Sequence, residues 1–146
     1  MAKFFDPKQF VISFAGVQME GFSESTMCKF EFSGASFDDV VGVDGEVTRV
    51  KSMDRRATLT VSLMQTSPTN DLLSAIYNAS RAGVNGADVG ALRVEDLNGR
   101  LVIAGAEAWI SDTPKPTYGK SAGEYEWTLR IANCDAFFGG SRHDLT

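Results

Sequence analysis

Cysteine and histidine are scarce in this sequence of 146 residues, which contains only Cys28, Cys134 and His143. The two cysteines are too far apart in the sequence for a CxxC redox motif. Together with the one histidine they provide three residues, which is fewer than the four ligands of a structural zinc site. We expect neither metal nor cofactor. In a reducing compartment both cysteines are expected in or near the core, and a single disulfide between them is the alternative.

Long hydrophobic runs are also missing. The longest, residues 101–106, is far below the roughly 20 residues that a bilayer crossing requires. Near the N-terminus, Asp6 and Pro7 interrupt any hydrophobic segment that could serve as a secretory signal. We therefore expect no membrane association and a protein that stays in the compartment where it is made.

Positive charge is in the minority, with 14 basic against 19 acidic residues and a net charge of -5. This balance argues against sequence-independent binding of nucleic acid through phosphate contacts. A hydrophobic content of 43% is that of an ordinary globular protein. The length suits one core, so we expect residues 1–146 to form a single domain.

Period-two alternation is the main pattern that is present. In residues 57–64, leucine and valine alternate with threonine and serine, which predicts a strand with one buried and one wet face. Residues 125–131 repeat the pattern, and Asn98-Gly99 predicts a hairpin between residues 91–97 and 100–103. Further strands are expected at residues 9–14, 17–19, 29–33 and 106–110.

One helix is predicted to begin at Ser67-Pro68 and to end at Gly83. Ser67 can cap the first turn, Pro68 suits the first helical position, and apolar residues follow at helical spacing. Strands on both sides of a single helix favour a mainly β fold. We expect a β-sandwich or barrel of antiparallel strands with one packed α-helix.

A long excursion at about residues 34–55 is the most unusual segment. Asp44-Gly45 lies between two valine-rich arms, which predicts a projecting hairpin with a type I′ turn. A connection of this length tends to be functional, and apolar arms must be covered by another surface. A second copy of the protein is the simplest candidate.

Catalytic chemistry is weakly represented. Glu124 and Glu126 place two carboxylates on one strand face at a separation near that of inverting glycosidases, but acidic pairs on wet faces are common. His143 lies beside Ser141 and Asp144 in a tail that cannot fix the geometry of a triad. The acidic residues near Asp44 do not follow the ligand spacing of a calcium loop. We expect no enzyme activity.

The order of elements and several local segments resemble the tail-tube proteins of contractile-tailed bacteriophages. The segments are residues 14–22, the hairpin through Asp44-Gly45, and residues 49–63, 69–80 and 118–129. The resemblance covers nearly the whole chain and implies a tail-tube-like fold. Six copies would close into a ring, and rings would stack into a hollow tube through which DNA passes without specific binding.

The same resemblance implies a structural protein of the virion, assembled in the host cytoplasm, with tail sheath protein, tape-measure protein and baseplate hub as partners. Type VI secretion tube proteins share this plan and are the nearest alternative. A ligand-binding sandwich, such as a carbohydrate-binding module using Trp109 and Trp127, is a more distant one.

Two sets of residues follow from this interpretation. The interface between rings or subunits is expected to include Val40, Val41, Val43, Asp44, Gly45, Val47, Arg49, Lys51, Asp54 and Arg55, with Arg56 beside them. The candidate lumen-facing residues are Thr58, Thr60 and Ser62, or Glu126 and Thr128.

Overall fold

The computed structural model describes residues 3–4, 10–23, 27–83, 89–97, 100–139 and 143–144. Twelve strands and one helix lie in these ranges. They are β1 (Lys3–Phe4), β2 (Phe10–Phe14), β3 (Val17–Gln18), β4 (Cys28–Phe32), β5 (Phe37–Val41), β6 (Val47–Lys51), β7 (Ala57–Met64), α1 (Thr69–Ala82), β8 (Gly90–Asp96), β9 (Leu101–Asp112), β10 (Glu124–Ile131), β11 (Cys134–Phe138) and β12 (His143–Asp144).

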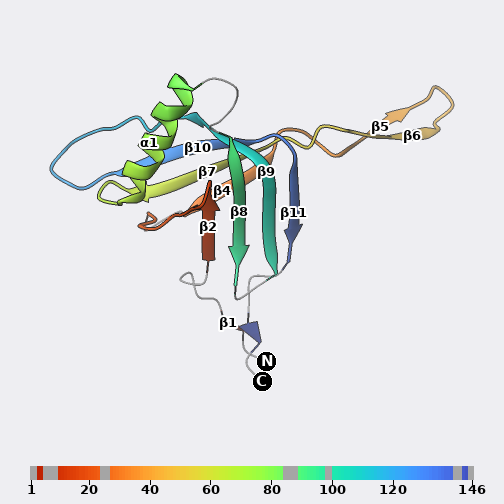
Figure 1. Cartoon of the computed structure of the whole chain (residues 1–146). Coiled ribbons are helices and arrows are strands. Elements are labelled where there is room, and N and C mark those ends of the chain that lie inside the picture. Colours follow the sequence, from red (N-terminus) through yellow and green to blue (C-terminus); the bar gives the residue numbers. More distant parts are fainter. Residues whose placement is uncertain are drawn as a thin grey trace.

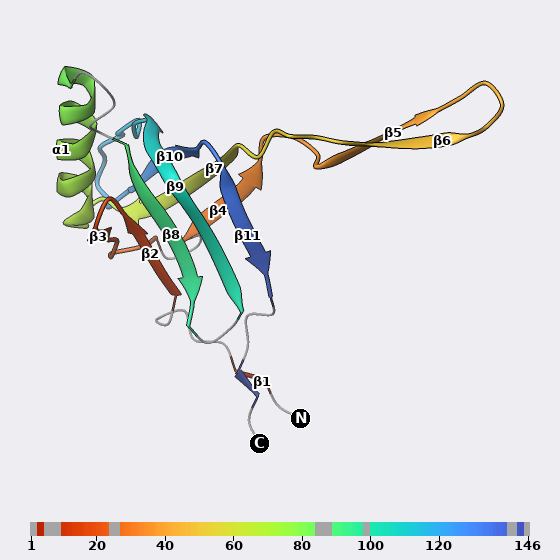
Figure 2. The same ribbon diagram turned by 45° about the vertical axis from the view of Figure 1, so that its right-hand side comes forward.

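The main sheet is antiparallel, in the order β3-β2-β8-β9-β10-β7-β4, with β11 also paired to β9. The long strand β9 joins two groups of strands. Its first half pairs with β8 and β11, and its second half pairs with β10. Figures 1 and 2 show β10, β7 and β4 crossing the direction of β2, β8 and β11, so the sheet folds over itself into two layers. This arrangement confirms the predicted mainly β fold with one helix.

The core lies between these layers. The buried side of the alternation predicted for residues 57–64 is confirmed, because Leu59, Val61 and Leu63 are fully buried. They pack with Phe14 of β2 and Leu129 of β10 in one hydrophobic cluster. At one side, the rings of Phe30 in β4 and Phe138 in β11 lie with centroids 5.8 Å apart. These side chains meet although β4 and β11 are not paired by backbone hydrogen bonds.

The helix packs on this sheet through Leu73, which is fully buried. It begins one residue later than predicted, at Thr69, with Pro68 at the N-cap. The Ser67 hydroxyl accepts a hydrogen bond from the Thr69 amide and donates one to the Glu20 carbonyl, so it ties the helix start to the chain after β3. The helix ends at Gly83, as the sequence predicts.

The segments at residues 100–103 and 106–110 were predicted as separate strands, and this is wrong because both belong to β9. Gly105 lies between them, and a Cβ atom there would meet Ile131 Cγ2 at 2.3 Å. The glycine therefore allows β9 to continue where it passes close to β10. The predicted hairpin between β8 and β9 is confirmed by their pairing, while the Asn98-Gly99 turn lies outside the described residues.

Strand β11 and the pair of end strands β1 and β12 were not predicted. The sequence of β11 mixes buried Cys134 with exposed Phe137 and Phe138, so it lacks clean alternation. Among the residues described here, no helix is long and apolar enough to cross a membrane.

Candidate assembly interface

Strands β5 and β6 form an antiparallel hairpin that projects away from the rest of the molecule in both views (Figures 1 and 2). Every residue of both strands is exposed. The exposed fraction is 58% for Val40, 60% for Val47 and 111% for Val43 near the tip. The described part of the chain therefore contains no surface that covers these apolar side chains.

Both faces of the hairpin carry apolar side chains. The strand pairing places Val41 opposite Val47 on one face, and Val40 opposite Thr48 on the other. On the first face the Arg49 guanidinium lies 4.7 Å from the centroid of the Phe37 ring. A partner surface could therefore remove valine side chains from water on either side.

The turn differs from the predicted type I′ geometry. Only Gly45 has a positive φ, of 88°, and Asp44 does not. The Gly45 amide donates to the Gly42 carbonyl at 2.9 Å, and the Gly42 amide donates to the Glu46 carbonyl at 2.7 Å. This is a three-residue loop in which a turn is followed by a left-handed glycine. Asp44 contributes its side chain instead, accepting a hydrogen bond from the Glu46 amide.

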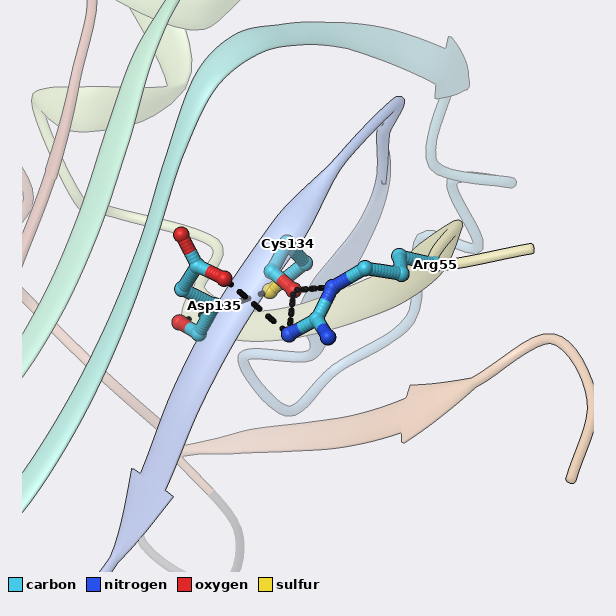
Figure 3. A network of polar contacts seen from close by, with 3 residues as sticks. All are labelled: Arg55, Cys134 and Asp135. Atoms are coloured by element: carbon cyan, nitrogen blue, oxygen red, sulfur yellow. Dashed lines mark hydrogen bonds and ion pairs between the residues drawn. The ribbon is translucent and has the colours of Figure 1, made fainter. Parts of the chain in front are cut away.

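The base of the hairpin is fastened to β11 by Arg55 (Figure 3). The guanidinium donates to the Cys134 carbonyl from Nη2 at 3.0 Å and from Nε at 3.3 Å. Nη2 also pairs with the Asp135 carboxylate at 3.0 Å, and the Cys134 amide donates to the Arg55 carbonyl. These bonds fix the point at which the hairpin leaves the sandwich.

A second ion pair lies beside this anchor. Arg56 donates from Nε and Nη2 to the two carboxylate oxygens of Asp54 at 2.9 Å. The hydrogen bond from the Arg56 side chain lowers the pKa of Asp54 to about 2. In the isolated chain, Asp54, Arg55 and Arg56 thus form ion pairs within the chain, at the positions that the sequence analysis assigned to the interface between rings or subunits.

The polar residues of β7 and β10 lie on one face of the sheet, opposite the core. Thr128 is paired with Thr60 in the register, and Glu126 with Ser62. The two sets of candidate lumen residues therefore belong to the same surface. Its neighbours on the adjoining strands are Lys29, Glu31, Asp112 and the half-buried Trp109, by register, and it also carries Glu124 and Arg130.

Ser62 is an exception on this face and corrects the prediction. It is only 7% exposed. Its amide donates to the Met27 carbonyl and its carbonyl accepts from the Ser23 amide, so the chain before β4 lies against it. Ser62 is therefore buried where the alternation predicted a wet position.

Two of the residues considered for catalysis and sugar binding, Glu124 and Trp127, are engaged in other contacts. Glu124 accepts a short hydrogen bond from the Ser23 hydroxyl. Trp127 is 2% exposed and belongs to the core, so it offers no stacking platform. Ser141 lies outside the described residues, and His143 is placed only by its backbone pairing with Phe4. No cluster of three or more potential metal ligands occurs among the residues that were described.

Both cysteines are free thiols. Burial raises the pKa of Cys28 and of Cys134 to about 11. At neutral pH they are protonated and are packed as small apolar groups, as the sequence predicts.

Residues 12–139 match the family described as the Bacteriophage PhiTE tail tube protein. The chain belongs to this tail tube family. It is 28% identical over 124 residues to Structural protein ORF10 of Pseudomonas phage KPP10. The aligned residues make up 85% of this chain and 72% of that protein. The tail tube family places the chain among structural proteins of the phage virion.

Solved structures with low sequence identity share the fold. The anti-feeding prophage cap that terminates the tube has a TM-score of 0.62 at 11% identity, covering 91% of this chain and 90% of that one. A chain of the native gene transfer agent virion has a TM-score of 0.59 at 13% identity, and the match covers 97% of this chain and 98% of that one. A chain of the PVC sheath-tube complex in the extended state has a TM-score of 0.57 at 11% identity, covering 91% and 90%.

Proposed function

We propose that this tail tube protein assembles into hexameric rings that stack as the inner tube of a contractile phage tail. Residues 1–146 act as one domain, and the tube is the conduit through which DNA leaves the capsid. The observation that carries the proposal is the exposed apolar hairpin on a chain of the tail tube family. The protein acts by assembly and has no enzyme activity.

The hairpin connects successive rings in this proposal. Its valines lose contact with water only when another subunit covers them, which makes stacking favourable. The interface residues are Val40, Val41, Val43, Asp44, Gly45, Val47, Arg49 and Lys51, while Asp54 and Arg55 at the base support the direction of the hairpin.

Edge strands favour closure into a ring. Within the described residues, β4 pairs only with β7, and β11 pairs only with β9. Each strand thus has one side free to pair with a neighbouring subunit. Ring closure protects such edges, which in isolated subunits invite uncontrolled association.

The polar face of β7 and β10 lines the lumen. Thr58, Thr60 and Thr128 supply small neutral groups, and Glu126 supplies negative charge. Together with its neighbours this face carries four carboxylates and three basic side chains. They are Glu31, Asp112, Glu124 and Glu126, and Lys29, Lys115 and Arg130. A surface with this balance repels phosphate, so DNA passes without sticking.

The outer partners follow from the same proposal. A tail sheath protein surrounds the tube, a tape-measure protein occupies it before ejection, and a baseplate hub starts its assembly. The fold shared with a sheath-tube complex supports the first of these. A type VI secretion tube is the alternative assembly, and the match to a phage tail tube family favours the phage tail.

Electron microscopy of the purified protein tests the proposal. Over a range of salt and protein concentrations, negative staining should show six-membered rings and hollow tubes, and light scattering should show large oligomers. A protein that stays monomeric under all of these conditions, with or without a baseplate seed, would contradict it.

A further inference from the structure

An apolar groove lies between α1 and the loop that follows β9. It has a volume of about 310 Å³, near the lower end of the roughly 300–1,000 Å³ that is typical of ligand sites. Its walls and floor are formed mainly by Ser74, Tyr77, Asn78, Pro114, Pro116 and Trp127. The groove is thus open, largely apolar and wide enough for a few side chains.

The loop that forms one wall is attached to the sheet. The hydroxyl groups of Tyr118 and Tyr125 are hydrogen-bonded to each other, and the Gly123 amide donates to Gln65 Oε1 at 2.9 Å. The opposite wall is the helix, whose Asn70 is hydrogen-bonded to Trp127. Both walls are therefore held in place before any partner arrives.

The tip of the hairpin carries exposed apolar side chains. Val43 is fully exposed, and Val41 and Val47 beside it are about 60% exposed. Helix α1, which forms one wall of the groove, and the hairpin lie at opposite ends of the molecule in both views, so a subunit cannot place its own tip in its own groove (Figures 1 and 2). A tip from a second copy would make a head-to-tail contact, which propagates along an assembly.

The charges of the two segments are complementary. Residues 38–48 of the hairpin contain four carboxylates, of Asp38, Asp39, Asp44 and Glu46, and no basic side chain. Lys115 of the loop lines a separate polar hollow with Asp112, Glu124 and Glu126, so its charge does not belong to the groove. Arg81 lies in the last turn of the helix and donates a hydrogen bond to Tyr77 of the groove. The positive charge at the groove is therefore that of Arg81, and it favours an acidic tip over tip-to-tip contact, which would bring like charges together.

We propose that the groove between α1 and residues 113–123 is the docking site for the hairpin tip of a second copy of this chain. Val43 enters the groove beside Tyr77 and Trp127, while Asp44 and Glu46 face Arg81. The inference rests on the proposed function, because it names the acceptor for the hairpin within a stacked tube.

Disulfide trapping between full-length variants tests this contact. Val43→Cys and Asn78→Cys proteins are mixed, allowed to assemble and oxidised at pH 8. The native cysteines stay in place, because burial raises the pKa of Cys28 and of Cys134 to about 11 and leaves little reactive thiolate. Since docking holds the two new thiols at high effective concentration, we expect roughly tenfold more crosslinked dimer than in unassembled protein.

The matched control replaces Asn78→Cys by Ala79→Cys. Ala79 is exposed on the same helix but points away from the groove, so it should give no crosslink with Val43→Cys. Assembled tubes that crosslink neither pair, or both pairs equally, would overturn the docking site and leave the proposed function intact. Failure of both mixtures to assemble, together with failure of the parent protein, would overturn both.

Filling the groove gives a second test that does not depend on crosslinking. Ser74→Trp should reduce tube length strongly, and Ala79→Trp should not. If Ser74→Trp forms normal tubes and loses only the binding of purified sheath protein, the groove belongs to the sheath and the proposal is wrong.

Discussion

Trp127 of β10 donates a hydrogen bond from its indole Nε1 to Oδ1 of Asn70 in α1, at 3.0 Å in a buried position. Asn70 also donates from Nδ2 to the Met64 carbonyl at the end of β7. One amide side chain therefore connects the helix to two strands of the sheet.

Replacing Asn70→Leu should destabilise the fold, because the buried indole N–H loses its acceptor. A buried donor without a partner costs about 1–3 kcal/mol. Urea unfolding followed by tryptophan fluorescence measures the change. Ala79→Leu on the exposed side of the helix is the control, with an expected effect within about 0.5 kcal/mol. Equal stability of the two variants would contradict a structural role for the pair.

Arg55 and Asp135 should contribute unequally to the stability of the anchor at the base of the hairpin. Arg55→Ala removes the ion pair with Asp135 and both hydrogen bonds to the Cys134 carbonyl, whereas Asp135→Asn removes only the ionic contact. The Asp135 side chain is 87% exposed, so the ion pair contributes little. Chemical unfolding at low and high salt should show a larger loss for Arg55→Ala in both. A loss that is equal for the two variants and disappears in salt would show that charge alone matters.

Asp54 should titrate abnormally. The Arg56 hydrogen bond lowers its pKa from 3.8 to about 2, so the folded protein holds the charged carboxylate more tightly than the unfolded chain. The stabilising effect is complete above about pH 4 and is lost as the pH falls through 2. Titration of the Asp54 carboxyl by NMR measures this pKa, and Arg56→Gln should raise it toward 3.8. An ordinary pKa in the parent protein would contradict the bidentate contact.

The proposed lumen face can be tested by reversing its charge. Glu126→Lys with Thr128→Lys should leave tubes intact but make them retain DNA, because each added cation contributes phosphate contacts. Co-sedimentation of short DNA with purified tubes at low salt measures retention, which should fall as salt is raised. Ala79→Lys on the exposed helix surface gives the background for an added lysine. DNA retention no greater than with that control would place these strands outside the lumen.

Sequence patterns predict the elements of this fold where one local rule dominates. The alternation of apolar and polar residues predicts β7 and β10 correctly, because each strand has a continuous buried side formed by residues such as Leu59 and Leu129. Asp44-Gly45 between two valine-rich segments predicts the hairpin correctly. The turn itself needs a positive φ only at Gly45, and not at Asp44. These features depend on neighbours in the sequence.

The remainder depends on contacts between distant residues. The continuity of β9 is permitted by the approach of Ile131 to Gly105, and the anchor of the hairpin depends on Arg55 meeting β11 some 80 residues later. Burial of Ser62 results from the chain before β4. The groove beside α1 combines residues of a helix, a loop and β10, so no single stretch of sequence indicates it.

Electron microscopy of a hairpin deletion tests whether the hairpin connects successive rings. Val40 to Val50 are removed, and Asp39 is joined to Lys51 through two glycines, which leaves the Arg55 anchor in place. We expect the deletion variant to fold with the parent's circular dichroism and to form rings but no stacked tubes, while the parent protein forms both. Tubes of normal length from the deletion variant would contradict it.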